Sequence, residues 1–148
     1  MDKLLLISIK EKYVKEILSG HKTIELRKSM PKVKAGDTVI IYTTHPTKAV
    51  TAIATVKRIL KTTPKAMWAD NKGVLGISRA EFDNYYKESQ FAIGIEISDV
   101  IRLDNEILLS AIKSIHPQFT PPQTFKYLDK YRTFRDYNKL TKPENNIN

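Results

Sequence analysis

The sequence predicts a single α+β domain built around a small mixed or antiparallel β-barrel with flanking helices. Two observations support this fold class. Apolar runs and alternating segments typical of strands recur along the chain, and segments with helical spacing lie between them. The 148 residues suit one domain with a sizeable core, and the sequence contains neither an internal repeat nor a domain linker.

The N-terminal part predicts a strand followed by a short helix. Residues 4–9 form an apolar run of strand length. Residues 11–18 begin with an acidic side chain, as the helix dipole favours, and place four apolar side chains in one stripe: Tyr13, Val14, Ile17 and Leu18. Gly20 is expected to end this helix, because glycine readily adopts the left-handed conformation of a helix C-terminus.

Three strands are predicted next. Residues 22–30 alternate, with Ile24 and Leu26 on one face, which is typical of a half-buried strand. Residues 38–44 contain a second apolar run. Residues 48–60 are rich in β-branched residues and alanine, as expected of a strand that curves across two faces of a barrel.

Two helices follow, each with a recognisable start. Thr63 supplies an N-cap and Pro64 the first helical position of one helix. A capping box formed by Ser78 and Glu81 begins the other. The aromatic side chains on these helices, including Tyr85, are most simply predicted to belong to the core.

The C-terminal part predicts one strand and two further helices. Residues 90–98 alternate cleanly and indicate a strand. Residues 108–115 suit a short helix, and residues 124–137 suit a longer one after a proline-containing loop. We expect the domain to span residues 1–137 and residues 138–148 to form a polar tail.

The positive charge is concentrated in the N-terminal half and in the tail. Residues 1–65 carry 14 lysines and arginines against 5 aspartates and glutamates, a balance of +9. Residues 66–125 carry 5 against 8, or −3, and residues 126–148 carry 6 against 3, or +3. A one-sided basic field attracts polyanions and indicates RNA or DNA, although a solubilising lysine-rich surface has the same composition.

The composition excludes several kinds of site. Without cysteine, disulfides, thiolate metal sites and cysteine nucleophiles are ruled out. The three histidines are scattered without ligand spacing, and neither a phosphate-binding glycine loop nor a nucleophile elbow is present, so we expect no metal and no cofactor. No apolar run approaches the roughly 20 residues of a membrane span. The first residues do not suit a secretory signal, so we expect a cytoplasmic protein with no membrane partner.

The segment after Gly20 is the strongest candidate for a binding site. Thr23, Glu25 and Arg27 share one strand face by the two-residue period, with Lys22 at the strand entry. A carboxylate accepts hydrogen bonds from an exocyclic amine, a guanidinium donates two parallel hydrogen bonds, and a hydroxyl can donate or accept one. This strand face therefore suits a planar polar ligand such as a nucleobase. The same pattern is also typical of a solvated strand face that carries an ion pair.

Two other segments are weaker candidates. Residues 126–135 interleave basic and aromatic side chains, as proteins that bind single-stranded nucleic acid do. The helical spacing of these aromatic residues equally suits packing on the core, and a protein partner for this helix is a further alternative. Tyr42 lies at the end of a strand, where a cleft could open.

Several motifs occur in an order that matches a known family. Ser8-Ile9-Lys10 is followed by G-x-K-T-x-E-x-R at residues 20–27 and by the pair Gly36-Asp37. In this order the chain resembles the ASCH domain family of the PUA-like superfamily. Residues 76–82 and 121–128 are similar to a bacterial and archaeal subgroup usually described as predicted transcriptional regulators. The resemblance extends to about residue 131.

The resemblance implies a PUA-like β-barrel of about five to six strands with flanking helices, and a ligand cleft beside the first helix and the following strand. It also implies binding of RNA or of a modified nucleotide, and in this subgroup a role in regulating transcription or translation. Together with the basic N-terminal half and the polar strand face, it leads us to expect these binding residues: Lys10, Lys22, Thr23, Glu25, Arg27, Tyr42 and Gln123.

Catalysis is the alternative, because some ASCH proteins are enzymes. One branch is similar in its G-x-K-T segment and hydrolyses the acetyl amide of N4-acetylcytidine with that lysine, a threonine three residues on and a glutamate just before a later helix. Lys22 matches the lysine, but Glu25 stands at the threonine position and residues 69–75 contain no glutamate. Another branch resembles a metal-assisted ribonuclease. In an enzyme, Lys22 with a pKa lowered by burial and by neighbours such as Arg27 would be the base, with Glu25 as its partner.

Overall fold

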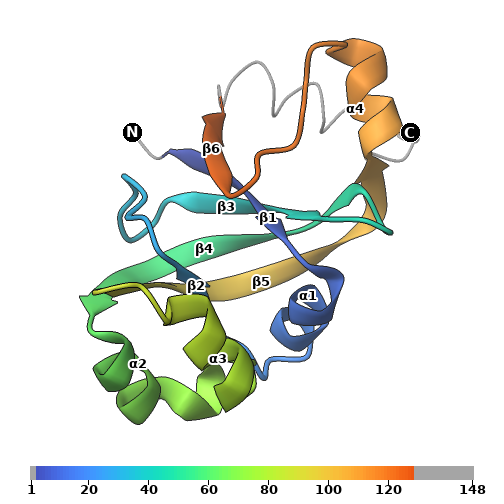
Figure 1. The fold of residues 1–148 in the computed structure, drawn as a ribbon. Helices are drawn as coiled ribbons and strands as arrows, with labels where there is room; N and C mark the ends of the chain where they lie inside the picture. The colour runs from blue at the N-terminus through green and yellow to red at the C-terminus, as the bar shows by residue number, and fades with distance from the viewer. Residues whose placement is uncertain (1–2, 129–148) are drawn as a thin grey trace.

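The computed structural model describes residues 3–128, which form a six-stranded sheet curled into a half-barrel, with four α-helices around it (Figure 1). The strands are β1 (Leu4–Ile9), β2 (Ile24–Arg27), β3 (Thr38–Thr43), β4 (Ala49–Thr62), β5 (Ala92–Leu108) and β6 (Phe125–Leu128). The helices are α1 (Glu11–Leu18), α2 (Pro64–Asn71), α3 (Arg79–Tyr86) and α4 (Leu109–Ile115). The predicted α+β fold class is confirmed.

The sheet is mixed. Its strand order is β2-β5-β4-β3-β1-β6, with β1 and β3 parallel and every other neighbouring pair antiparallel. Strands β4 and β5 are long, and three register shifts interrupt their pairing. Because such irregularities increase the local twist, they allow the two strands to bend and curl the sheet.

Strand β1 is buried on both faces and separates two core clusters. Leu5, Ile7 and Ile9 belong to one cluster, which also contains the apolar side chains of α1. Leu4 and Leu6 belong to the other cluster, which α4 covers. The continuous apolar run in the sequence therefore reflects a strand covered on both sides.

A third core cluster joins α2 and α3 to the edge of the sheet. Ile24 and Leu26 of β2 pack there with Met67 of α2 and with Phe82 and Tyr86 of α3. Figure 1 shows these two helices together beside the end of β2 and β5. The alternation of β2 thus directs its apolar side chains towards α2 and α3 and leaves the other face for charged side chains.

The predicted helix over residues 124–137 is wrong in its described part. Residues 125–128 form β6, which pairs antiparallel with β1 from Ile7 and Phe125 to Leu4 and Leu128. Without β6, β1 would expose a row of unpaired backbone groups at the sheet edge. The hydrogen bonds that residues 125–128 form with β1 therefore favour a strand over the helix that their spacing also allows. The remainder of that helix, the boundary at residue 137 and the polar tail lie outside the described residues.

Two strand boundaries also differ from the prediction. The strand expected over residues 22–30 is confined to β2, because residues beyond Arg27 leave the pairing with β5. The strand expected over residues 90–98 continues through β5 to Leu108. Alternation fades after Ser98 because Asp99 has a positive φ of 51° and much of the remaining strand is exposed.

The Gly36-Asp37 motif fixes the segment between β2 and β3. Gly36 adopts a φ of +96°, which favours glycine. The buried carboxylate of Asp37 accepts hydrogen bonds from the backbone N–H of Lys3 at 2.9 Å and of Lys34 at 2.8 Å. Burial raises the pKa of Asp37, but these two hydrogen bonds outweigh it and hold the pKa below its ordinary value. The motif is therefore structural in this chain.

None of the helices within residues 3–128 is long and apolar enough to cross a membrane.

Gly76 is the glycine most restricted by its surroundings. Its φ is +60°, and a Cβ at this position would lie 2.6 Å from the Cβ of Lys22. Gly76→Ala should therefore lower the free energy of unfolding by about 2 kcal/mol or more, through the left-handed backbone and the clash. Chemical denaturation measures this, with Gly73→Ala as the matched control because a Cβ there meets nothing within 4 Å. Equal stability of the two variants would contradict the prediction.

Candidate functional site

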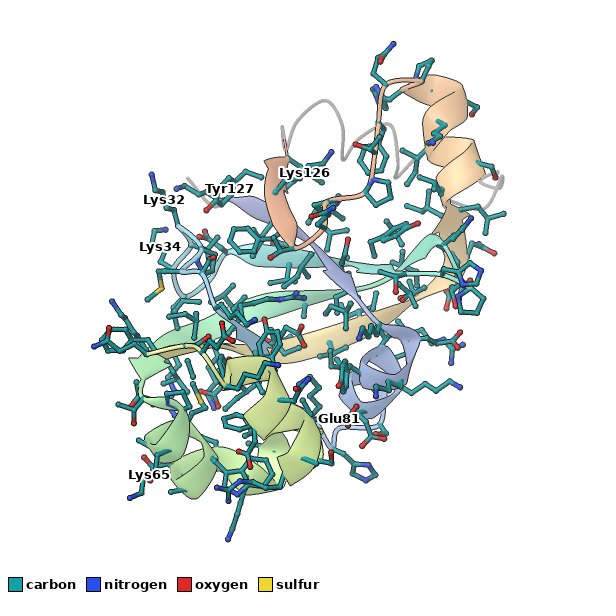
Figure 2. All side chains as sticks on the ribbon, viewed as in Figure 1. Lys32, Lys34, Lys65, Glu81, Lys126 and Tyr127 are labelled. Carbon is teal, nitrogen blue, oxygen red and sulfur yellow. The ribbon has the colours of Figure 1, made fainter. Side chains whose placement is uncertain are left out.

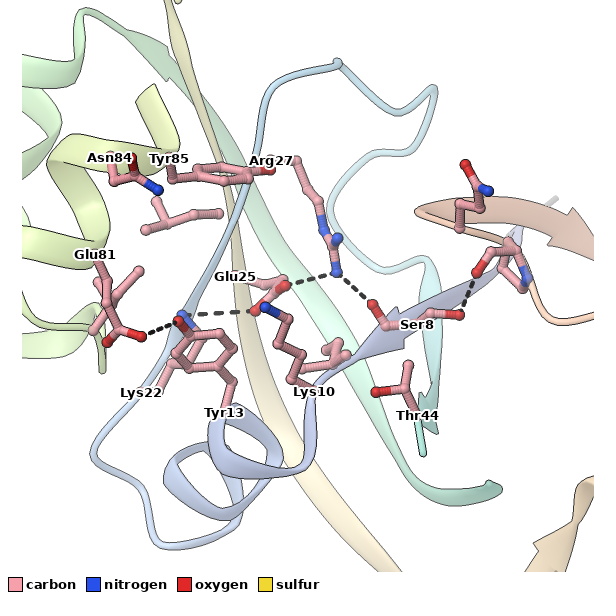
Figure 3. A pocket seen from close by; sticks show the side chains of 15 residues that line it. Ser8, Lys10, Tyr13, Lys22, Glu25, Arg27, Thr44, Glu81, Asn84 and Tyr85 are labelled. Atoms are coloured by element: carbon pink, nitrogen blue, oxygen red, sulfur yellow. Dashed lines mark hydrogen bonds and ion pairs between the residues drawn. The ribbon is translucent and has the colours of Figure 1, made fainter. Parts of the chain in front are cut away.

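A cleft of about 490 Å³ opens between α1, α3 and the ends of β1 and β2 (Figure 3). We call it the α1–α3 cleft. In Figure 3, Tyr13 faces it from α1, Glu25 and Arg27 from β2, and Glu81, Asn84 and Tyr85 from α3. Ser8, Lys10, Lys22, Thr44, Pro122 and Gln123 supply the remaining polar and rim positions used below. A cleft of this volume can hold a small molecule or a single nucleotide unit.

The turn after α1 directs Lys22 and β2 into the cleft. Gly20 has a φ of +87° and ends α1 as predicted. The N–H of Lys22 then donates to the carbonyl of Glu16, and the N–H of Thr23 donates to the carbonyl of Val74. These bonds fix the chain immediately before β2, so that Lys22 and Glu25 lie on the cleft side.

The cleft floor contains a buried carboxylate between two cations. Glu25 lies 2.7 Å from Nη2 of Arg27 and 3.6 Å from Nζ of Lys22. The side chains of Lys22, Glu25 and Arg27 are only 3%, 9% and 13% exposed. A carboxylate buried to this degree needs a charged partner, and this one has two. The floor therefore carries a net positive charge of one.

Lys22 is held by its surroundings in a fixed position. Its Nζ donates to the carbonyl of Leu75 at 2.6 Å and lies 5.3 Å from the centre of the Tyr13 ring. Burial lowers the pKa of Lys22 below its ordinary value of 10.5, and the nearby Arg27 acts in the same direction, while Glu25 opposes both. Lys22 thus gives up a proton more readily than an exposed lysine.

Helix α3 forms the opposite wall. The N–H of Glu81 donates to Oγ of Ser78, which in turn donates to the Glu81 carboxylate, so the predicted capping box is formed. The same carboxylate makes an ion pair with Lys12 and accepts a hydrogen bond from the Tyr13 hydroxyl at 3.4 Å. Glu81 therefore links α3 to α1 across the cleft.

One turn further along α3, Tyr85 presents its ring at the cleft. Nζ of Lys28 lies 4.5 Å from the centre of this ring, and burial raises the pKa of the Tyr85 hydroxyl. An aromatic ring with a cation beside it is a surface on which a planar heterocycle can stack.

The cleft is closed on its remaining side by β1 and the loop before β6. Nη2 of Arg27 donates to the carbonyl of Ser8 at 2.8 Å, and Oγ of Ser8 donates to the carbonyl of Pro122 at 2.6 Å. The N–H of Ser8 donates to the carbonyl of Thr124. Figure 3 shows this chain of contacts running from Glu25 through Arg27 and Ser8. Lys10 and Gln123 stand exposed at the rim.

Of the seven binding residues expected from the sequence, five line the cleft: Lys10, Lys22, Glu25, Arg27 and Gln123. Thr23 and Tyr42 lie outside it. The backbone of Thr23 is held on both sides: its N–H donates to the carbonyl of Val74, in the segment between α2 and α3, and its carbonyl accepts from the N–H of Ile97 in β5. Tyr42 is buried in the core cluster that α4 covers, and burial raises its pKa. Thr44, two residues later, reaches the cleft instead.

Several lining residues were not expected to form a site. Tyr85, predicted to belong to the core, packs partly buried against the third core cluster and also lines the cleft together with Glu81 and Asn84. These three residues have i, i+3 and i+4 spacing and share one helix face, whereas Phe82 and Tyr86 face the core. The spacing groups these three residues on one face, but the sequence alone does not show whether the ring of Tyr85 packs only in the core or also lines a cleft.

No group of three or more metal-ligating side chains occurs among residues 3–128.

The ASCH domain model matches residues 7–107 of the chain. An "ASCH domain-containing ribonuclease" of Zymomonas mobilis is 28% identical over 127 residues, which cover 86% of this chain and 85% of that protein. The crystal structure of an ASCH protein from Zymomonas mobilis superposes with a TM-score of 0.88 at 26% identity, over 95% of this chain and 96% of that one.

A more distant structure shares the fold alone. Human THYN1 protein, solved in complex with 5-methylcytosine containing DNA, is 12% identical with a TM-score of 0.62, over 97% of this chain and 100% of that one.

The lowered pKa of Lys22 predicts how stability depends on pH. Between the folded pKa and the unfolded value of about 10.5, the unfolded chain binds more protons at this site, so stability should rise with pH. The free energy of unfolding of the wild type, minus that of Lys22→Met, should therefore increase through this interval in urea titrations. A difference that falls with pH would show that the attraction of Glu25 outweighs burial.

Proposed function

The chain belongs to the ASCH domain family, and we propose that it is an RNA-binding protein that holds one nucleotide base in the α1–α3 cleft. The observation that carries this proposal is the charged floor. Lys22, Glu25 and Arg27 present hydrogen-bond donors and an acceptor at the bottom of a cleft whose upper wall is the Tyr85 ring. Hydrogen bonds at a base edge and stacking on its face are the two interactions that single-stranded RNA offers most directly.

Net charge supports a nucleotide over a neutral ligand. The charged residues lining the cleft are three cations, Lys10, Lys22 and Arg27, and two anions, Glu25 and Glu81, a balance of +1. The single negative charge of Glu25 is compensated by the two positive charges of Lys22 and Arg27, so the floor keeps one positive charge that faces the cleft. Lys10 at the exposed rim suits a phosphate, while the floor suits a base carbonyl or amine.

The relative from Zymomonas mobilis supports RNA as the polymer, because its name is that of a ribonuclease and the match extends over most of both chains. A role in regulating transcription or translation stays a prediction from the subgroup resemblance. A cytoplasmic location also stays a prediction, made from the sequence alone.

Ribonuclease activity is the second candidate, favoured by one further observation. Two groups able to move a proton, Lys22 and Glu81, line the same cleft, and burial lowers the pKa of Lys22. One of them would remove the proton of a ribose 2′-hydroxyl as it attacks the adjacent phosphorus, and the leaving oxygen would take a proton from the other. Glu81 does not restore the amidohydrolase pattern, because it lies within α3 and not just before a helix, and Glu25 still stands at the threonine position.

Removal of the stacking surface should weaken RNA binding. We expect Tyr85→Ala to weaken binding of a labelled single-stranded RNA by roughly tenfold or more, because each stacked base contributes about 1–3 kcal/mol. Tyr85→Phe keeps the ring and should bind as the wild type does, which separates stacking from hydroxyl chemistry. Fluorescence anisotropy measures both. Wild-type protein without measurable RNA affinity, or equal affinity of Tyr85→Ala, would rule out this site.

The catalytic candidate makes a separate prediction. Lys22→Met and Glu81→Gln should each slow RNA cleavage by about 10²-fold or more, as loss of a general acid or base does. Glu81→Gln retains a capping box, so its fold should persist. The assay follows labelled RNA with and without divalent metal, and N4-acetylcytidine is tested in parallel. Absence of turnover by the wild type would leave binding as the function. Unchanged turnover in both variants would show that Lys22 and Glu81 are not the catalytic groups.

A further inference from the structure

We infer that an RNA strand held in the α1–α3 cleft continues over a second surface, formed by Lys3, Lys32, Lys34 and Tyr127 and named here the β6 track. The inference rests on the proposed function and adds a second site to it. Tyr127 lies on β6, the two lysines at 32 and 34 lie in the segment between β2 and β3, and Lys3 immediately precedes β1. Figure 2 shows Lys32, Lys34 and Tyr127 gathered beside β6.

Two segments lead from the cleft to this surface. One begins at Arg27 in the cleft floor, passes Lys28 beside the Tyr85 ring and reaches Lys32. The other begins at Gln123 on the rim and reaches Tyr127 four residues later, a span of no more than roughly 14 Å. The segments meet where the N–H of Lys32 donates to the Tyr127 hydroxyl at 2.6 Å. The track thus begins at the cleft and is close enough for one short strand to contact both.

The track has the chemistry of a single-strand surface. Tyr127 is 45% exposed, and its ring lies 6.3 Å from that of Phe125, which is on the same face of β6 by the two-residue period. Nζ of Lys3 lies 5.7 Å from the Tyr127 ring centre. Residues 28–36 contain three lysines and no acidic residue. The buried carboxylate of Asp37 lies 3.9 Å from Nζ of Lys34, whose side chain is still 69% exposed. Cations beside an exposed aromatic ring bind phosphates and stack a base.

The track is also held in place before any ligand arrives. Nζ of Lys3 donates to the carbonyl of Lys32 at 2.9 Å, and Asp37 accepts from the backbone of Lys3 and Lys34. The backbone that carries Lys3, Lys32 and Lys34 is therefore hydrogen-bonded to its neighbours at the start of β1 and on β6. Lys126, by contrast, lies over the Phe119 ring at 4.2 Å and donates to Thr120, on the other face of β6, and is not part of the track.

The test compares two RNA probes and matched charge variants. A labelled dinucleotide reports the cleft alone, and a single-stranded RNA of about ten nucleotides reports the cleft and the track. We expect Lys32→Ala/Lys34→Ala to weaken binding of the longer probe by roughly tenfold at ~0.1 M salt, and to reduce the slope of log affinity against log salt by about 1.4, at 0.7 for each phosphate. Dinucleotide affinity should not change.

The controls separate the track from general charge and from the fold. Lys65→Ala/Lys72→Ala removes two exposed lysines, one on α2 and one directly after it, and Figure 2 shows Lys65 far from β6. This double variant should change the affinity for the longer probe little. Tyr127→Phe loses the hydrogen bond to Lys32 but keeps the ring, and should bind the longer probe better than Tyr127→Ala does. Circular dichroism checks that each variant is folded.

The outcomes distinguish the track from the cleft. If Lys32→Ala/Lys34→Ala and Lys65→Ala/Lys72→Ala bind the longer probe equally, while both bind the dinucleotide as the wild type does, the track is wrong and the cleft stands. If Tyr85→Ala changes the affinity of neither probe, the cleft is not the site, and a track that continues from it is overturned as well. If the wild type binds neither probe, both proposals fail.

Discussion

One buried carboxylate sets the arrangement around the cleft. Glu25 leaves water when β2 pairs with β5, and its charge must then be compensated within the protein. Arg27 and Lys22 meet this requirement from opposite sides, and each in turn is fixed by a backbone carbonyl, that of Ser8 in one case and of Leu75 in the other. Through these two bonds the carboxylate connects β2 with β1 and with the chain that leads into α3.

The main elements could be predicted from the sequence where local pattern and tertiary environment agree. The apolar stripe of α1 and the alternation of β2 each reflect a face that is buried in the fold, and the capping box at Ser78 satisfies the first turn of α3 locally. Five cleft residues were expected because they are charged or polar and lie in or near the family motifs. Their placement in a cleft was implied by the family resemblance, because spacing alone also suited a solvated strand face and would have included Thr23.

What could not be predicted depends on partners far away in the chain. Residues 125–128 have both a two-residue alternation and helical spacing, and only the unpaired edge of β1 decides between them. The spacing of Tyr85 suits a core residue as well as a cleft residue, because α3 packs Phe82 and Tyr86 inward on the neighbouring face. Tyr42 lies in β3 and Thr44 directly follows the end of that strand, and only the position of α4 over Tyr42 shows which of the two is covered.

The two surfaces differ in how the protein supports them. The cleft floor is built from buried ions whose contacts with one another and with backbone carbonyls fix its geometry without a ligand. The β6 track instead carries exposed lysine side chains on a fixed backbone. Exposed lysines supply affinity that depends on salt, whereas a buried, oriented floor discriminates between bases. A protein with both surfaces would combine a contact that is selective for the base with one that accepts any RNA sequence.

The several contacts of Glu81 limit which cleft residues can change among related proteins. Its carboxylate closes the capping box of α3, pairs with Lys12 and accepts from Tyr13, so the width of the cleft and the start of a helix depend on a single side chain. A mutation that reshapes this wall also weakens the fold, and natural variation is expected to avoid it. The side chains of Lys10 and Gln123 are exposed at the rim of the cleft, so their replacement should affect the fold little. Drift in ligand preference among related proteins should therefore accumulate at the rim, with the walls inherited unchanged.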